Sequence, residues 1–315
     1  MEDAVTSTRE LLPSGRDVPF SEIEVTLARM VRDGGRRKRG PARALTATVI
    51  VIGDTPRLAA AADALEQLGE VGGVRTILIS EGNRTAAIAR VTETAIAISG
   101  LAPRFLNNAV AALRLSSLPA VVWWRGGSVA ALDDLAALAD RVILDAEEPE
   151  GSWVEAPRLL DRTALSDLRW TRLTRWRSAV AHLFDLPQVR QGVRGFRKLS
   201  IDASDPYAAR LYAGWLRSSL RWGSTVSIDI ATTTGGAADT PLRRVRLEGT
   251  PASIDVQLRE GHGCLAAAVE GLDGSTRVVP LGDGRLASLI GEELGVRTRD
   301  GAFERALASA QEIPA

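Results

Sequence analysis

Residues 44–54 read ALTATVIVIGD, and this stretch decides the fold class of the first half of the chain. Its run of β-branched residues predicts a buried strand. Thr55-Pro56 then opens a helix that extends to Leu68, because proline is tolerated at the first helical position and Gly69 stands just past the end. The chain therefore enters a pattern of strand followed by helix.

The same pattern continues outward to about residue 150. Further strands are predicted at 74–80, 118–125 and 141–145, and further helices at 103–116 and 130–139. Residues 92–99 alternate less regularly, and we expect them to form an antiparallel neighbour in the sheet. Strands separated by helices of this length indicate a three-layer α/β domain with a mostly parallel sheet.

The residues before this domain have a different character. Residues 1–20 are polar and aperiodic, and we expect a loose arm followed by a helix that begins at Ser21. The helix ends near Gly34-Gly35, before the basic run Arg36–Arg39. That run could contact nucleic acid, but a solvated linker is favoured because no aromatic residues interleave it.

The second half of the chain predicts a different architecture. An acidic loop at 147–150 leads to a helix capped by Thr174 and to a second helix that starts at Ser204-Asp205-Pro206. Short strands are then predicted at 224–231, 242–249, 252–259, 264–270 and 275–281, and helices at 284–294 and 301–311. We therefore predict an α+β domain with antiparallel strands, and divide the chain into residues 1–43 (arm and helix), 44–150 (α/β domain) and 151–315 (α+β domain).

Composition narrows the classes of function. The 315 residues carry 39 basic and 39 acidic side chains, so no overall field favours nucleic acid or an anionic membrane. A single cysteine excludes an internal disulfide framework and a multi-cysteine metal site. No uninterrupted apolar stretch of about 18 residues occurs, so we expect a cytoplasmic protein without a membrane span.

Motifs for catalysis are scarce. The turn Gly53-Asp54-Thr55-Pro56 lacks the glycine pattern that admits a dinucleotide pyrophosphate, and no phosphate-binding loop is present. His262 and Cys264 could form a nucleophile pair, but we interpret them as a turn residue and a small buried hydrophobe at the start of a strand. His182 is interpreted as a helix-face residue. We therefore predict no catalytic residue, no cofactor site and no metal site.

Two clusters stand out from this background. The first, residues 123–127, lies at the carboxyl end of a predicted core strand. The second, residues 167–177, lies within a segment, residues 161–222, that holds 12 basic and 5 acidic side chains. Tryptophan and arginine are enriched in the energetic centres of protein interfaces, although the same residues can form a core with arginines extending past it. The candidate partner-binding residues are Trp123, Trp124, Arg125, Trp170, Thr171, Arg172, Trp176 and Arg177.

Both clusters carry a resemblance to a known family. Residues 119–126, PAVVWWRG, resemble the P-V-V-x-W-W-x-G segment of the OpcA glucose-6-phosphate dehydrogenase assembly proteins. Residues 167–177, DLRWTRLTRWR, are similar to that family's D-L-x-W-T-R-L-T-P-W-R signature. The sequence departs from the family pattern at Ala120, Arg125 and Arg175, the last of which replaces a proline.

The resemblance implies a non-catalytic assembly factor and allosteric activator. Such a protein binds glucose-6-phosphate dehydrogenase, favours its active oligomer and so supports NADPH production in the oxidative pentose phosphate pathway. With one cysteine, this chain has no intramolecular disulfide switch. The alternative is a sugar-phosphate-binding protein or enzyme that uses the arginine-rich region as a phosphate clamp.

Overall fold

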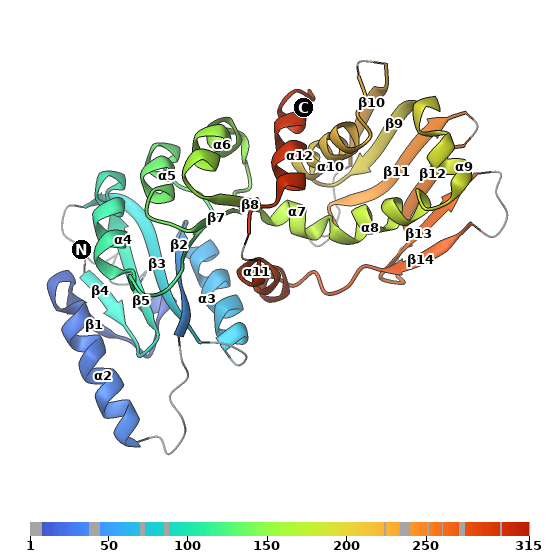
Figure 1. Cartoon of the computed structure of the whole chain (residues 1–315). Helices are drawn as coiled ribbons and strands as arrows, with labels where there is room; N and C mark the ends of the chain where they lie inside the picture. Colours follow the sequence, from blue (N-terminus) through green and yellow to red (C-terminus); the bar gives the residue numbers. More distant parts are fainter. Residues whose placement is uncertain are drawn as a thin grey trace. The chain divides into compact units, whose positions relative to one another are not determined.

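The computed structural model describes residues 8–37, 45–69, 73–84, 88–223, 225–233, 240–250, 252–259, 261–270, 275–296 and 298–314. The chain divides into two compact units (Figure 1). Unit 1 comprises Met1–Ser166 and Glu293–Thr298, and unit 2 comprises Asp167–Glu292 and Arg299–Ala315. The division falls 16 residues beyond the predicted position at 150, because the helix and strand that follow the acidic loop belong to unit 1.

Unit 1 is built on an eight-stranded sheet in the order β1-β4-β5-β3-β2-β6-β7-β8. The five central strands, from β5 to β7, all run parallel. Their bounds are Leu45–Ile52 (β2), Gly73–Arg84 (β3), Ala95–Leu101 (β5), Ala120–Trp124 (β6) and Arg141–Leu144 (β7). The outer strands are Arg16–Pro19 (β1), Ile88–Val91 (β4) and Ala164–Asp167 (β8). The predicted mostly parallel sheet is confirmed.

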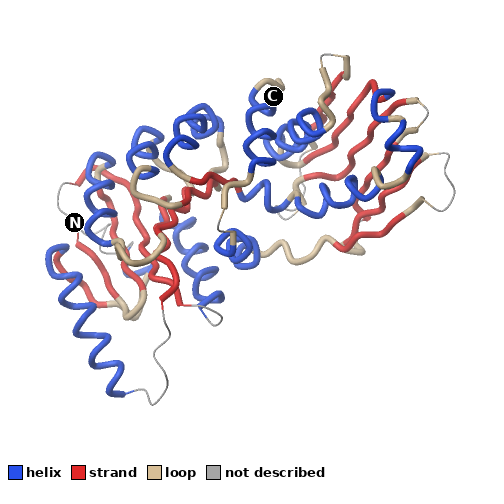
Figure 2. Tube along the Cα trace, viewed as in Figure 1, coloured by secondary structure: helices blue, strands red, loops and turns tan. Residues whose placement is uncertain are grey.

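Helices cover both faces of this sheet, as Figure 2 shows with helices in blue and strands in red. Helix α3 (Thr55–Gly69) packs on β2 and β3, whereas α4 (Leu106–Leu113), α5 (Val129–Ala136) and α6 (Glu150–Arg162) pack against one another in turn. Helix α2 (Ile23–Arg37), introduced by the 3-10 turn η1 (Phe20–Glu22), packs near β1 and β4, and η2 (Pro103–Phe105) precedes α4. The apolar strand residues between these layers are fully buried.

Two predictions for unit 1 were wrong. The supposed loose arm contains β1, which pairs antiparallel with β4 and is fixed by the ion pair between Arg90 and Asp17 at 2.6 Å. The supposed antiparallel strand at 92–99 is β5, which runs parallel to β3. The strand that runs antiparallel to β5 is β4. It lies between β3 and β5 in the sequence, but in the sheet it lies on the side of β5 away from β3.

Unit 2 is built on a six-stranded sheet in the order β10-β9-β11-β12-β13-β14. The strands are Phe196–Ala203 (β9), Ser227–Thr232 (β10), Leu242–Gly249 (β11), Ile254–Arg259 (β12), Cys264–Val269 (β13) and Arg277–Pro280 (β14). All neighbours are antiparallel except β9 and β10. The parallel pair arises because helix α10 (Pro206–Ser219) connects these two strands and so returns the chain in the same direction. The sequence had not predicted β9.

The helices of unit 2 cover one face of its sheet. Helix α8 (Thr174–Leu183) packs on β12, β13 and β14, and α10 packs on β9 and β10. Helix α12 (Gly301–Gln311) packs on α10 so closely that a side chain on Gly214 would collide with the Ala306 carbonyl oxygen. The shorter elements are α7 (Leu168–Arg172), α9 (Pro187–Gln191) and η3 (Val193–Gly195), and α11 (Leu286–Gly295) runs from unit 2 into unit 1.

Part of the basic run at 36–39 lies outside the described residues. The helix α6 was missed by the sequence analysis. Its acidic first residues and the internal Pro157 both resemble loop composition, although a buried Trp153 and Leu159 anchor one face of the helix.

Candidate functional site

Three helices of unit 2 are each capped by an aspartate. Asp167 accepts a hydrogen bond from the Arg169 amide at the start of α7. Asp205 accepts bonds from the amides of residues 207 and 208 in α10, and Asp300 from those of residues 302 and 303 in α12. Each carboxylate thus satisfies backbone donors and complements the positive end of a helix dipole.

The second sequence cluster connects these caps to one another. The Arg169 Nε donates to Asp205 at 2.9 Å, and the Trp170 indole Nε1 donates to Asp300 at 2.8 Å. Adjacent residues of α7 therefore reach the caps of α10 and α12. Residues 167–170 with these two aspartates form a structural junction, which we call the cap junction.

Arg177, from the same cluster, and Phe303 pack against Trp170. The Arg177 guanidinium lies 3.4 Å from the Trp170 ring centroid and donates to the Trp170 carbonyl oxygen at 3.2 Å. On α12, the Phe303 ring centroid lies 5.9 Å from that of Trp170. Thr174 opens α8 without capping it, and its hydroxyl instead accepts a bond from Arg177. The cluster is a packed unit rather than a row of free side chains.

Trp176 is equally enclosed. Its backbone carbonyl oxygen accepts a hydrogen bond from the Tyr212 hydroxyl at 3.2 Å, and both side chains are fully buried. Burial raises the pKa of Tyr212, while the nearby Arg177 charge opposes that shift, so the phenol stays protonated as a hydrogen-bond donor.

The structure therefore separates the predicted partner-binding residues into two groups. The side chains of Trp123, Trp124, Trp170 and Trp176 are at most 3% exposed, and Thr171 is 7% exposed. In this structure they do not present a surface to another protein. Arg125, Arg172 and Arg177 are partly exposed, so only these three of the eight residues reach the surface.

The first cluster lies at the carboxyl edge of the unit 1 sheet, where parallel α/β folds bind ligands. Arg125 donates from Nε to Asp145 at 2.8 Å and from Nη1 to the Arg57 carbonyl oxygen at 2.6 Å. Trp123 donates to the same Asp145 carboxylate at 3.3 Å. The cluster thus ties the ends of β6 and β7 to the start of α3.

A cavity of about 360 Å³ lies at this edge, lined by Arg57, Trp124, Gly126, Gly127, Val129, Ala146, Glu147, Glu148 and Ser152. Arg57 forms an ion pair with Glu147 at 2.6 Å and another with Asp54 at 3.3 Å. Asp54 also accepts the Arg57 amide at the start of α3, so both the helix end and the arginine already have an anionic partner. This arrangement disfavours a phosphate at the position used by dinucleotides.

The glycine pair beside this cavity has a conformational role. Gly126 and Gly127 have φ values of +136° and +131°, which side chains rarely adopt. The Glu81 carboxylate packs against Gly127 and accepts the Ser128 amide at 2.8 Å. Burial raises the pKa of Glu81, and the hydrogen bond from Ser128 partly offsets this.

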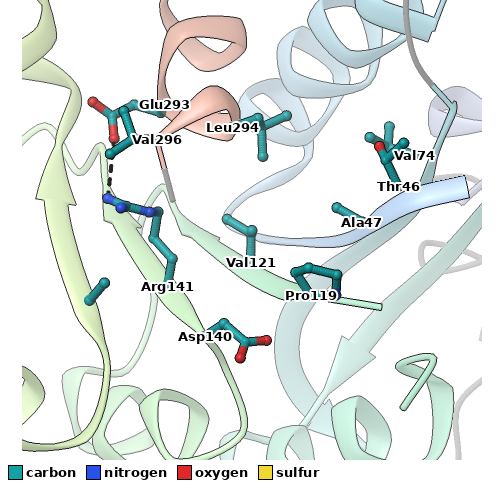
Figure 3. A pocket seen from close by; sticks show the side chains of 11 residues that line it. Thr46, Ala47, Val74, Pro119, Val121, Asp140, Arg141, Glu293, Leu294 and Val296 are labelled. Carbon is teal, nitrogen blue, oxygen red and sulfur yellow. Dashed lines mark ion pairs between the residues drawn. The ribbon is translucent and has the colours of Figure 1, made fainter. Parts of the chain in front are cut away.

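A second cavity of about 240 Å³ lies at the opposite, amino edge of the same sheet (Figure 3). Its wall includes Glu293, Leu294 and Val296, and the Arg141 side chain points toward Glu293 with 3.6 Å between their charged atoms. Arg141 also donates to the Thr298 carbonyl oxygen at 2.7 Å. These contacts fasten residues 293–298 to unit 1.

The residues weighed for catalysis in the sequence line neither of these cavities. His262 lies in the turn before β13, as predicted, and Cys264 opens that strand but is partly exposed rather than buried. His182 is exposed on α8 beside Ser178. Among the described residues no group of three His, Cys, Asp or Glu side chains could hold a metal ion.

Within the part of the chain that the structure describes, no helix combines the length and the apolar character needed to cross a membrane.

The comparisons with known proteins first define a class. Transcriptional regulator Gal80p from Kluyveromyces lactis superimposes with a TM-score of 0.50 over 90% of this chain and 94% of that one, at 7% identity. This likeness shows a shared fold, a Rossmann-like unit followed by an α+β unit, and nothing of function. The chain is thus a two-unit protein with a Rossmann-like unit and an α+β unit.

Sequence relatives define the family more narrowly. Residues 163–307 match the OpcA family model, described as the C-terminal domain of a glucose-6-phosphate dehydrogenase subunit. A Nostoc punctiforme protein provisionally named OxPP cycle protein OpcA is 31% identical over 138 residues, 40% of this chain and 30% of the relative. A Synechococcus elongatus protein of the same name is 33% identical over 126 residues, 37% of this chain and 28% of the relative. Residues 163–307 thus match the OpcA family, and the matches span less than a third of the length of these relatives.

Proposed function

We propose that this protein is a non-catalytic assembly factor and allosteric activator of glucose-6-phosphate dehydrogenase, supporting NADPH production by the cytoplasmic oxidative pentose phosphate pathway. One observation carries the proposal: the family match named for a subunit of that enzyme covers residues 163–307, which hold the cap junction and most of unit 2. The relatives carry the name of an OxPP cycle protein, which agrees with that role.

The site geometry supports a binding role over a catalytic one. At the carboxyl edge of unit 1, the arginines that could bind a phosphate are paired with Asp54, Asp145 and Glu147. In unit 2, Arg169 and Arg177 are engaged by Asp205 and by Trp170. A sugar-phosphate clamp built from Arg57, Arg125, Arg169 or Arg177 would require these side chains to leave partners that stabilise the fold.

In the proposed contact surface, the arginines of the two clusters contact the enzyme and the tryptophans do not. Arg172 and Arg177 reach the surface over α7 and α8, and Arg125 does so in unit 1. The buried tryptophans would hold these arginines in position. Activation requires tighter binding to the active form of the enzyme than to the inactive form, and about 1–3 kcal/mol of such coupling changes affinity roughly 5- to 150-fold.

The direct test measures the host's glucose-6-phosphate dehydrogenase with and without this purified protein, together with size-exclusion chromatography of the mixture. We expect co-elution and either a higher specific activity or a lower substrate KM. The variant Arg172→Glu should weaken both effects, whereas Arg158→Glu, on an exposed side chain of α6, should not. Absence of both complex and kinetic change at micromolar concentrations would refute the proposal.

A further inference from the structure

Four arginines of unit 2 are exposed and have no carboxylate partner among the described residues. Arg190 belongs to α9, Arg194 to η3, Arg197 to β9, and Arg221 follows α10. None of these guanidinium groups forms an ion pair with a carboxylate of the described residues. They therefore account for much of the local basic excess that the sequence shows between 161 and 222.

Aromatic contacts bring these segments together. The Trp222 ring centroid lies 6.3 Å from that of Phe196, which in turn lies 6.1 Å from that of Phe184. Arg197, next to Phe196, donates from Nη1 to the Arg194 carbonyl oxygen at 2.7 Å, and Arg221 directly precedes the half-buried Trp222. We call Arg190, Arg194, Arg197, Arg221 and Trp222 the Trp222 patch.

The backbone at Arg221 gives an independent indication of use. Its φ of 52° lies in the left-handed region, and Arg221 is the one non-glycine residue with such a φ in the described part of the chain. It occupies the position after the end of α10, where the Trp222 amide bonds back to the Arg217 carbonyl oxygen at 3.0 Å. Glycine is the favoured residue there, so an arginine carries a conformational cost. Such strain is often retained where the side chain has a function.

We propose that the Trp222 patch docks an acidic segment of a partner protein. Guanidinium groups bind carboxylates through paired hydrogen bonds, and arginine beside tryptophan is the composition of interface centres. The Trp222 ring meets Phe196 edge to face and is half-buried, which leaves little of it to stack on a base and so disfavours nucleic acid. The identification of that partner as glucose-6-phosphate dehydrogenase rests on the proposed function.

The first experiment uses poly-L-glutamate as the probe and isothermal titration calorimetry as the readout. We expect the wild-type chain to bind, and the double variant Arg194→Glu/Arg221→Glu to bind at least about tenfold more weakly. The matched control is Arg259→Glu/Arg277→Glu, the same change at two exposed arginines of β12 and β14. Equal binding by both double variants would overturn the proposal, as would an oligo(dT) strand that binds the patch as tightly as the acidic polymer.

A second variant guards against a folding artefact. Arg221→Gly should weaken poly-L-glutamate binding while raising the melting temperature by about 2–4 °C, because it removes both the charge and the strain. Weaker binding by a more stable protein cannot come from misfolding. Unchanged binding by this variant would exclude Arg221 from the site.

The last arm separates this proposal from the proposed function. If glucose-6-phosphate dehydrogenase binds wild type and Arg194→Glu/Arg221→Glu equally, the patch proposal fails and the association stands. If the enzyme binds neither protein while poly-L-glutamate still discriminates between them, the patch stands and the proposed partner is wrong.

Discussion

The cap junction and the Trp222 patch both combine arginine with tryptophan, but these side chains have different surroundings. In the cap junction, Arg169 and Trp170 donate to the aspartates that cap α10 and α12, and the tryptophan is buried. In the Trp222 patch, the arginines have no carboxylate partner among the described residues and the tryptophan is only half-buried. The comparison teaches that pairing, rather than composition, separates an arginine that stabilises the fold from one available to a partner.

The largest expected difference between the two regions is in stability. Trp170→Ala should lower the free energy of unfolding by about 3–5 kcal/mol, because it removes a buried ring and leaves Asp300 with one bond fewer. Trp222→Ala should cost only about 1–2 kcal/mol, since that ring is half-buried. Urea unfolding followed by circular dichroism measures both. Equal losses would break the distinction between a core tryptophan and a surface one.

A smaller effect is expected at the carboxylate that receives the Trp170 indole. Asp300→Ala removes the cap of α12 and leaves a buried donor without its acceptor, so we expect a loss of about 2–3 kcal/mol. Thermal and urea unfolding give the value, and Asp185→Ala, an exposed aspartate of the same unit, is the matched control. A loss no greater than that of the control would show that the junction does not hold α12.

The Trp222 patch should respond in the opposite direction. Arg221→Gly relieves the left-handed backbone and should raise the free energy of unfolding by about 1 kcal/mol. The corresponding change in the cap junction, Arg169→Gly, should lower it, because Arg169 is 9% exposed and paired with Asp205. If both substitutions changed the free energy of unfolding in the same direction, Arg221 with its strained backbone and Arg169 with its ion pair would not differ as proposed.

The smallest effect concerns pH and lies in unit 1. Glu81 has a raised pKa in the folded protein, so the fold binds its proton more tightly than the unfolded chain does. The contribution of this proton to the free energy of unfolding is therefore fully present below the ordinary pKa of 4.5. It is lost as the pH rises through the pKa that Glu81 has in the folded protein. Glu81→Gln keeps an acceptor for the Ser128 amide and should flatten this part of the stability profile. An unchanged profile between pH 4 and 7 would show that burial does not penalise the Glu81 charge.

The sequence predicted those parts of the fold that depend on local signals. The β-branched residues of β2 and the Pro56 and Gly69 at the ends of α3 mark their elements without reference to any partner. Asp205 before Pro206 likewise predicted the start of α10, and Asp205 does cap that helix. Such signals involve residues close together in the chain, so they can be recognised in a single sequence.

Other features depend on partners far along the chain. Strand β1 is short and polar and exists through its pairing with β4, whose residues lie about 70 positions further along the chain. The direction of β5 follows from the placement of β4 outside it, which periodicity does not encode. The tryptophan clusters were ambiguous for a different reason, since buried cores and interface centres favour the same residue types. The basic excess before residue 222 was visible, but only the ion pairs show which arginines remain unpaired.

The segment 293–298 has a consequence for synthesis of the chain on the ribosome. Glu293 and Thr298 are held by Arg141, and with Leu294 and Val296 they complete the amino edge of unit 1. Unit 1 therefore cannot finish folding when Ser166 emerges, although domains usually fold in order from the N-terminus. All eight strands of its sheet have been translated by then, but the contacts of Glu293, Leu294, Val296 and Thr298 at the amino edge can form only after most of unit 2 has been translated. Closure of the first unit is thereby linked to completion of the second.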